Sequence, residues 1–116
     1  MGKMQRNKGA SFERQVAGMF KDHGYNAYRT AQHCGNTGDA ADVSGVPYLH
    51  LECKAVEKMR LYDWMAQAVR DAKKKGNVPV VIHKQNYKDV LVTMRWCDFI
   101  EFYSEWEAGH ENEIQN

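Results

Sequence analysis

The sequence predicts an α/β (α+β) fold in which a mixed sheet of about five strands is flanked by helices, in the order α-β-β-β-α-β-β-α. Three observations lead to this prediction. Apolar residues recur at helical spacing near both ends and in the middle of the chain. Short apolar or alternating segments of strand length lie between them. The length of 116 residues, with 43% hydrophobic and 27% charged residues, is typical of one globular domain.

The first half of the chain is expected to form one helix and three strands. The helix begins near residues 9–11 and ends at Gly24, because apolar side chains recur at helical spacing between these points. The preceding residues 1–8 are polar and basic and are expected to form a mobile arm. The predicted strands cover residues 26–30, 41–44 and 48–54, and the last two form a hairpin around a Gly-Val-Pro turn.

The second half is expected to supply a helix and two further strands. The helix covers residues 61–75 and ends at Gly76, after a lysine run that suits the negative end of a helix dipole. The apolar segment 78–83 is typical of a strand buried on both faces. Residues 89–94 are expected to form the next strand.

The last segment is expected to form an aromatic helix followed by a polar, acidic tail. Trp96, Phe99 and Tyr103 recur at helical spacing, and the tail begins at about Glu107. One face of this helix is expected to cover the core. The remaining aromatic side chains indicate a partner surface, such as a second copy of the chain. The cysteine in this segment, Cys97, is expected to be a small buried residue.

The net charge of +1 conceals an uneven distribution. Residues 1–95 contain all 16 Lys and Arg but nine Asp and Glu, a net charge of +7. Residues 96–116 contain six acids and no Lys or Arg, a net charge of −6. A basic body suits a polyanionic partner such as nucleic acid. On charge alone, a lysine-rich solvated surface explains the same pattern equally well.

The composition disfavours a membrane protein and favours an intracellular one. No apolar run approaches the length of a bilayer span. The basic N-terminus precedes no apolar segment of the kind found in secretory signals. The three cysteines, Cys34, Cys53 and Cys97, match no disulfide framework. The cytoplasm or the nucleoid is therefore the expected location.

The most informative stretch runs from Asp42 to Lys54. Because side chains alternate along a strand, Glu52 and Lys54 share one face with His50, whereas Cys53 belongs to the apolar face. The predicted hairpin brings Asp42 back toward Glu52 from the neighbouring strand. Two carboxylates that converge in this way make a site for a hard cation such as Mg²⁺.

A lysine beside such a cation can hold a water molecule or offset negative charge on a phosphate. Glu13 lies on the border of the buried face of the first helix and is expected to reach the same edge of the sheet. Each residue also has a simpler explanation. Glu52 and Lys54 could form a surface ion pair worth roughly 0–1 kcal/mol, and Asp42 could be a turn residue. These explanations weaken because one helix–hairpin arrangement directs all four groups to one place.

Three motifs in this order and spacing resemble the PD-(D/E)XK nuclease superfamily, and most closely its Holliday junction resolvase-like and phage endonuclease members. The motifs are residues 8–14 (Lys-Gly-Ala-Ser-Phe-Glu-Arg), residues 38–43 (Gly-Asp-Ala-Ala-Asp-Val) and residues 52–54 (Glu-Cys-Lys). Ala41 stands where the name of the motif has proline. The resemblance covers roughly residues 8–95 and implies a restriction-endonuclease-like core.

The resemblance also implies a function. It is that of a Mg²⁺-dependent endodeoxyribonuclease, with Mn²⁺ expected to substitute, that hydrolyses phosphodiester bonds in Holliday junctions or other branched DNA during recombination or repair. Asp42, Glu52 and the backbone carbonyl of Cys53 would bind the metal, with Glu13 as a further ligand. The expected setting is the cell interior, including that of a phage-infected host.

The implied catalytic set is completed by two side chains. Lys54 would position the attacking water, and Gln67 would orient Lys54 or a phosphate, with Asp71 one turn later on the same helix. The chain is then a single nuclease domain with a basic arm (1–8), a catalytic core (9–95) and an aromatic helix with an acidic tail (96–116). A homodimer is expected because two sites would cut two strands of a junction.

Basic and small polar side chains around the expected site are candidates for DNA contacts. Some lie at the end of the first strand and in the segment after it, where a plain loop is the alternative. Others precede the middle helix, and one lies at its end, where a solvated helix end is the alternative. The candidates are Lys8, Arg14, Arg29, Thr30, Gln32, His33, Asn36, Lys58, Arg60 and Lys73.

Three other interpretations remain open. His33, Cys34, His50 and Cys53 could bind zinc, although their spacing matches no common zinc pattern. The chain could be a non-catalytic nucleic-acid-binding module that has kept a nuclease-like fold, which predicts salt-sensitive binding without cleavage. It could also be an interaction protein in which these charges are surface pairs.

Overall fold

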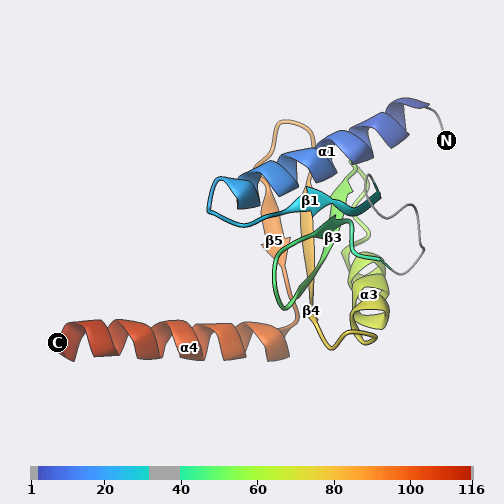
Figure 1. The fold of residues 1–116 in the computed structure, drawn as a ribbon. Helices are drawn as coiled ribbons and strands as arrows, with labels where there is room; N and C mark the ends of the chain where they lie inside the picture. Colours follow the sequence, from blue (N-terminus) through green and yellow to red (C-terminus); the bar gives the residue numbers. More distant parts are fainter. Residues whose placement is uncertain (1–2, 32–39, 116) are drawn as a thin grey trace.

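The computed structural model describes residues 3–31 and 40–115, with side chains for 7–31 and 40–111. The five strands form one mixed sheet in the order β1-β2-β3-β4-β5, and α4 extends away from the body that the sheet, α1 and α3 form (Figure 1). The predicted α/β class, strand number and element order are confirmed. The elements are α1 (Lys3–Lys21), β1 (Tyr28–Arg29), β2 (Val43–Ser44), β3 (Leu49–Ala55), α3 (Leu61–Ala72), β4 (Val78–Lys84), β5 (Leu91–Thr93) and α4 (Trp96–Gln115).

The predicted hairpin joins β2 and β3, which run antiparallel with Val43 opposite Leu51. Its turn depends on Gly45, which has a φ of +89°, and a Cβ there would collide with the backbone carbonyl of Asn26. β3 and β4 are parallel and are joined through α3, whereas β4 and β5 are antiparallel. The turn and the parallel pair together place β3 at the centre of the sheet.

The two faces of the sheet are built differently. On one face, Phe12 and Val16 of α1 pack in an apolar cluster with Leu51 and Cys53 of β3. On the other, the apolar cluster of α3 against β4 is smaller and centres on Trp64, with Ala68 and Val81. The remaining buried positions of β3, His50 and Glu52, are polar.

The limits of two helices differ from the prediction. α1 begins at Lys3, about two turns before the predicted start, so residues 3–8 continue the helix instead of forming a separate arm. The predicted start was too late because Gly9 and the polar residues before it do not show the apolar spacing of the rest of the helix. α3 ends at Ala72, and the lysines that follow form a turn.

The expectations for the last segment were wrong in three respects. α4 continues to Gln115, and its aromatic side chains are exposed, including Trp96 (71%) and Trp106 (57%), so the helix does not cover the core. Cys97 is exposed as well. The radius of gyration is 15.4 Å, against about 13 Å for a compact chain of this length, because α4 projects from the body (Figure 1).

None of the helices in the described part of the chain is both long and apolar enough to span a membrane.

Candidate active site

Asp42 is fixed over β3 by the hairpin. Its backbone N–H donates to the carbonyl of Leu51 at 2.8 Å, which holds the residue just before β2. Its carboxylate Oδ2 accepts a hydrogen bond from the backbone N–H of Cys53, also at 2.8 Å. Since Cys53 follows Glu52 and precedes Lys54, this bond anchors the Asp42 carboxylate beside the two residues that the sequence pairs with it.

The electrostatics of Asp42 indicate that a cation fits here. Burial, followed by repulsion from the Glu52 carboxylate, raises the pKa of Asp42 from 3.8 to about 7, although the Cys53 N–H opposes the shift. Two partly desolvated carboxylates that repel each other are oxygen ligands suited to a divalent cation. The donor set therefore fits the magnesium ion that the sequence implies.

Glu13 approaches the same region from α1. The Arg29 guanidinium donates a hydrogen bond from Nε to Glu13 Oε1 at 3.1 Å, and both side chains are largely buried. Burial raises the pKa of Glu13, the Arg29 cation opposes this, and the Glu52 and Lys54 charges act on it in opposite directions. The charges of Glu52 and Lys54 therefore lie close enough to act on the Glu13 carboxylate.

Glu52 is the most deeply buried of these acids, at 2% exposure. Its Oε1 lies 2.8 Å from Nε2 of His50, which shares the same face of β3 as the alternation predicted. Asp71 of α3 lies on this side as well, and the ligand atoms of His50, Glu52 and Asp71 are all within 4.8 Å of one another. This three-residue cluster was not predicted, because the sequence gives neither the rotation of α3 nor its height over the sheet.

The other two predicted catalytic groups are Lys54 of β3 and Gln67 of α3. Lys54 is half-buried and stands beside His83 in the parallel register of β3 and β4. Gln67 is half-buried on α3, one turn before Asp71. Within residues 7–31 and 40–111, no hydrogen bond joins Gln67 to the acids or to Lys54. The proposed role of Gln67 therefore stays a prediction.

Cys53 faces the apolar core, as predicted, which leaves its backbone for the site. Burial raises the pKa of its thiol, with repulsion by the nearby acids adding to the effect, so a zinc-binding thiolate is disfavoured here. His50 is described by the structure, whereas His33 and Cys34, the remaining residues of the zinc alternative, lie outside the described residues. The zinc interpretation that needs the Cys53 thiolate is thus not favoured.

Apart from Lys8, the candidate DNA-binding residues fall into three groups. Arg29 is bonded to Glu13, and Thr30 is buried with its hydroxyl 2.6 Å from that of Ser44. The exposed side chains are those of Arg14, Lys58, Arg60 and Lys73. Gln32, His33 and Asn36 lie outside the described residues.

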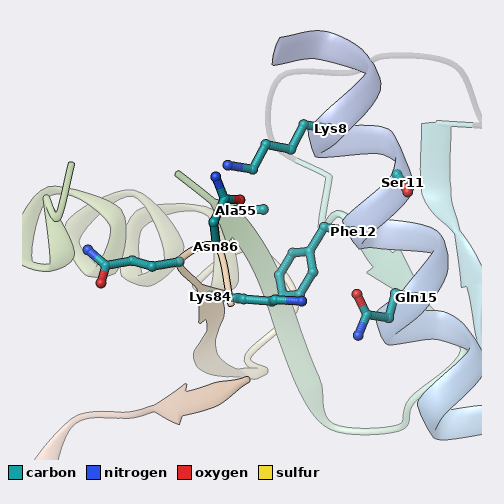
Figure 2. Close-up of a pocket in the computed structure, with 8 residues that line it drawn as sticks. Lys8, Ser11, Phe12, Gln15, Ala55, Lys84 and Asn86 are labelled. Carbon is teal, nitrogen blue, oxygen red and sulfur yellow. The ribbon is translucent and has the colours of Figure 1, made fainter. Parts of the chain in front are cut away.

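Lys8 lies at the far end of the sheet from the hairpin turn. It lines a cavity of about 210 Å³ between α1 and the ends of β3 and β4, where its Nζ is 3.7 Å from Glu57 Oε1. Figure 2 shows Lys8 and Phe12 of α1 across this hollow from Lys84 and Asn86. The cavity is small and basic, and it lies on the α1 side of the sheet.

Two acids from a β-hairpin and a lysine two residues after the second acid, set on a mixed sheet between helices, define a PD-(D/E)XK nuclease core. The chain matches, over residues 4–115, the family described as "Phage putative PDDEXK endonuclease", and it belongs to that family.

Solved structures include a similar fold. The Hjc Holliday junction resolvase of the archaeal hyperthermophile Archaeoglobus fulgidus shares 22% sequence identity, with 75% of this chain and 72% of that chain covered and a TM-score of 0.56. At this identity the likeness shows the fold. A search of curated proteins found no match.

Proposed function

We propose that this nuclease is a Mg²⁺-dependent endodeoxyribonuclease that cuts branched DNA. The observation that carries the proposal is a pair of mutually repelling carboxylates, the half-buried Asp42 and the buried Glu52, with Asp42 anchored by the backbone N–H of Cys53, the residue between Glu52 and Lys54. Without a cation this arrangement is electrostatically unfavourable. Its retention is explained if a divalent cation binds there.

Asp42, Glu52 and the backbone carbonyl of Cys53 would hold the cation, and Glu13 would bind it directly or through water. When bound, the ion supplies a Lewis acid and lowers the pKa of a coordinated water. Lys54 would position that water for in-line attack on a phosphate and offset the charge that develops. Gln67 would orient Lys54 or the phosphate from α3.

The proposal of DNA as substrate rests on the charge of the body and on the family. Residues 1–95 carry a net charge of +7, which favours a phosphate backbone. Preference for a branch point is supported by the similar fold of a Holliday junction resolvase. The candidate contacts Arg14, Lys58, Arg60 and Lys73 are exposed and free to reach a backbone.

A cleavage panel tests this function. Four-way junction, flap, nicked and linear duplex DNA are incubated with the protein with and without Mg²⁺, and product ends are identified. We expect Mg²⁺-dependent cuts in the junction or flap that leave 5′-phosphate and 3′-hydroxyl ends. Lys54→Ala should lower the rate at least about 100-fold, whereas the matched control Lys88→Ala, an exposed lysine of the β4–β5 turn, should cut like the wild type.

Two outcomes would contradict the proposal. If no divalent cation supports cleavage although DNA binds and the binding weakens with salt, the chain is a binding module. If Lys54→Ala cuts as fast as Lys88→Ala, the assignment of the lysine is wrong.

We further propose a homodimer in which α4 of each protomer packs on the basic body of the other. Trp96, Phe99, Tyr103, Trp106 and His110 form one continuous stripe of ring contacts on exposed α4. Their spacing of three and four residues places them along one side of the helix. The segment carries a net charge of −6 and the body +7, so a second copy offers a surface of opposite charge.

Sedimentation equilibrium tests the dimer. Wild type should sediment as a dimer, Trp106→Ala should dissociate more readily, and Tyr62→Ala, which removes an aromatic ring 93% exposed on α3, should leave the assembly unchanged. A monomeric wild type, or equal behaviour of the two variants, would rule this interface out.

A further inference from the structure

A buried carboxylate oxygen on α3 has no hydrogen-bond partner among the residues that the structure describes. The side chain of Asp71 is 8% exposed, and among the described side chains its Oδ2 is buried and accepts no hydrogen bond. Its Oδ1 is 3.8 Å from Nε of Arg70, whose side chain is 71% exposed, so that cation is shared with solvent. Buried polar atoms are normally paired, and an exception calls for an explanation.

The position of Asp71 in its helix sharpens the problem. Trp64, Ala68 and Ala72 are the other buried residues of α3 and occupy the face that packs on the sheet. Asp71 falls on this face, where an apolar residue would be expected. A carboxylate at a core position with one oxygen left without a hydrogen bond among the described residues indicates that a ligand completes its surroundings.

Asp71 faces two other ligand-type groups. The ligand atoms of His50, Glu52 and Asp71 lie within 4.8 Å of one another, and all three residues are buried. His50 Nε2 and Glu52 Oε1 are already 2.8 Å apart. Two ligands of a tetrahedral Zn²⁺ at 2.0–2.1 Å are separated by about 3.4 Å, so small side-chain shifts would bring all three groups onto one ion.

We propose that His50, Glu52 and Asp71 bind a second divalent cation of the class that accepts imidazole ligands, such as Zn²⁺. One imidazole with two carboxylates is a donor set for these metals, whereas Mg²⁺ prefers oxygen ligands alone. The ion would neutralise both acids and supply the missing partner of Asp71 Oδ2.

The site is separate from that of Asp42 but adjoins it through Glu52. His50 and Asp71 line a cavity of about 570 Å³ between the β2–β3 turn and the end of α3, which gives an ion a path of entry. Neither Asp42 nor Glu52 lines this cavity, and the Asp42 carboxylate is held by the Cys53 N–H. Glu52 would therefore be the common ligand of two neighbouring ions, one on the Asp42 side and one on the α3 side.

Zn²⁺ and Mn²⁺ titration calorimetry of the full chain without DNA tests the second site independently of nuclease activity. Wild type should show two binding events per chain. Asp71→Asn and His50→Gln should each weaken the same binding event at least about tenfold and leave the other event unchanged. Asp42→Asn should weaken that other event. The matched control Asp63→Asn, an exposed aspartate of the same helix, should retain both.

The visible absorption of bound Co²⁺ gives a second readout, because loss of the imidazole in His50→Gln should change its spectrum. If Asp71→Asn and His50→Gln bind Zn²⁺ with wild-type stoichiometry and affinity, the proposal is overturned. It is also overturned if wild type binds one ion per chain and Asp42→Asn alone abolishes that binding. The second outcome would keep the Mg²⁺ site and remove only the new one.

Discussion

The two faces of β3 differ in role: one packs in the apolar core, and the other carries buried polar groups of the candidate site. Leu51 and Cys53 point to α1 and join its apolar cluster, and Leu51 is fully buried. Glu52, on the opposite face, is almost as deeply buried but carries a carboxylate next to His50. Neighbouring residues of one strand thus experience equal burial with opposite consequences for stability.

The contrast shows where this small domain obtains its stability and where it gives some up. The α1 face gains free energy through apolar burial. On the α3 face, buried charges cost free energy unless a partner compensates them. We infer that the α1 cluster stabilises the sheet strongly enough to keep the acids of the other face in place.

The largest expected effect comes from the α1 face. Leu51→Ala removes a fully buried side chain from the main cluster, and the free energy of unfolding should fall by about 3–5 kcal/mol. Urea unfolding measures this change. The proposed difference between the two faces is contradicted if Glu52→Gln, on the other face, lowers the free energy of unfolding of the metal-free protein as much as Leu51→Ala does.

A smaller effect on the free energy of unfolding, which depends on pH, is expected from Asp42. Its pKa in the folded chain, about 7, lies above its ordinary value of 3.8. The folded state therefore holds an extra proton between these values, and raising the pH through this window lowers the free energy of unfolding. One pKa unit corresponds to about 1.4 kcal/mol. Allowing for solvent screening, we expect a loss of about 2 kcal/mol.

Thermal unfolding of the metal-free protein at several pH values measures this loss. Asp42→Asn should flatten the decline and should be more stable than the wild type at the alkaline end. Asp89→Asn, an exposed aspartate, should retain the decline. A decline of equal size in Asp42→Asn would assign the effect to other groups.

The smallest effect is expected from Arg29. Removing its guanidinium in Arg29→Ala leaves the Glu13 carboxylate without its 3.1 Å partner, and the pKa of Glu13 should rise further. If Glu13 must be ionised, the acid limb of the pH–rate profile for DNA cleavage should move to higher pH, with a change in stability of about 1 kcal/mol. An unchanged limb would mean that Glu13 takes no part in the reaction.

The sequence predicted the fold because its patterns reflect local physics. Alternation in residues 49–54 assigned Glu52 and Cys53 to opposite faces, and the turn at Gly45 set the hairpin that carries Asp42. Periodicity failed at α4, because an aromatic stripe looks the same whether it covers the protein's own core or faces outward. It failed at the start of α1 because polar residues give no apolar spacing.

The site was predictable only in part, for a related reason. Asp42, Glu52 and Lys54 are close in sequence and are linked by one hairpin, so strand geometry brings them together. The link from Asp71 to His50 depends on how α3 is rotated against the sheet, which packing around Trp64 and Ala68 decides. The family resemblance placed Gln67 and Asp71 on the helix over the site, but it did not give the contact with His50, and so the cluster of His50, Glu52 and Asp71 was not predicted.

The central claim is that the acids of the hairpin serve cleavage. The most direct test is the Mg²⁺-dependent single-turnover rate on four-way junction DNA for Asp42→Asn beside Asp89→Asn. We predict that Asp89→Asn cuts at the wild-type rate and that Asp42→Asn remains folded, binds the junction and cuts at least about 100-fold more slowly. Equal rates for the two variants would contradict the claim.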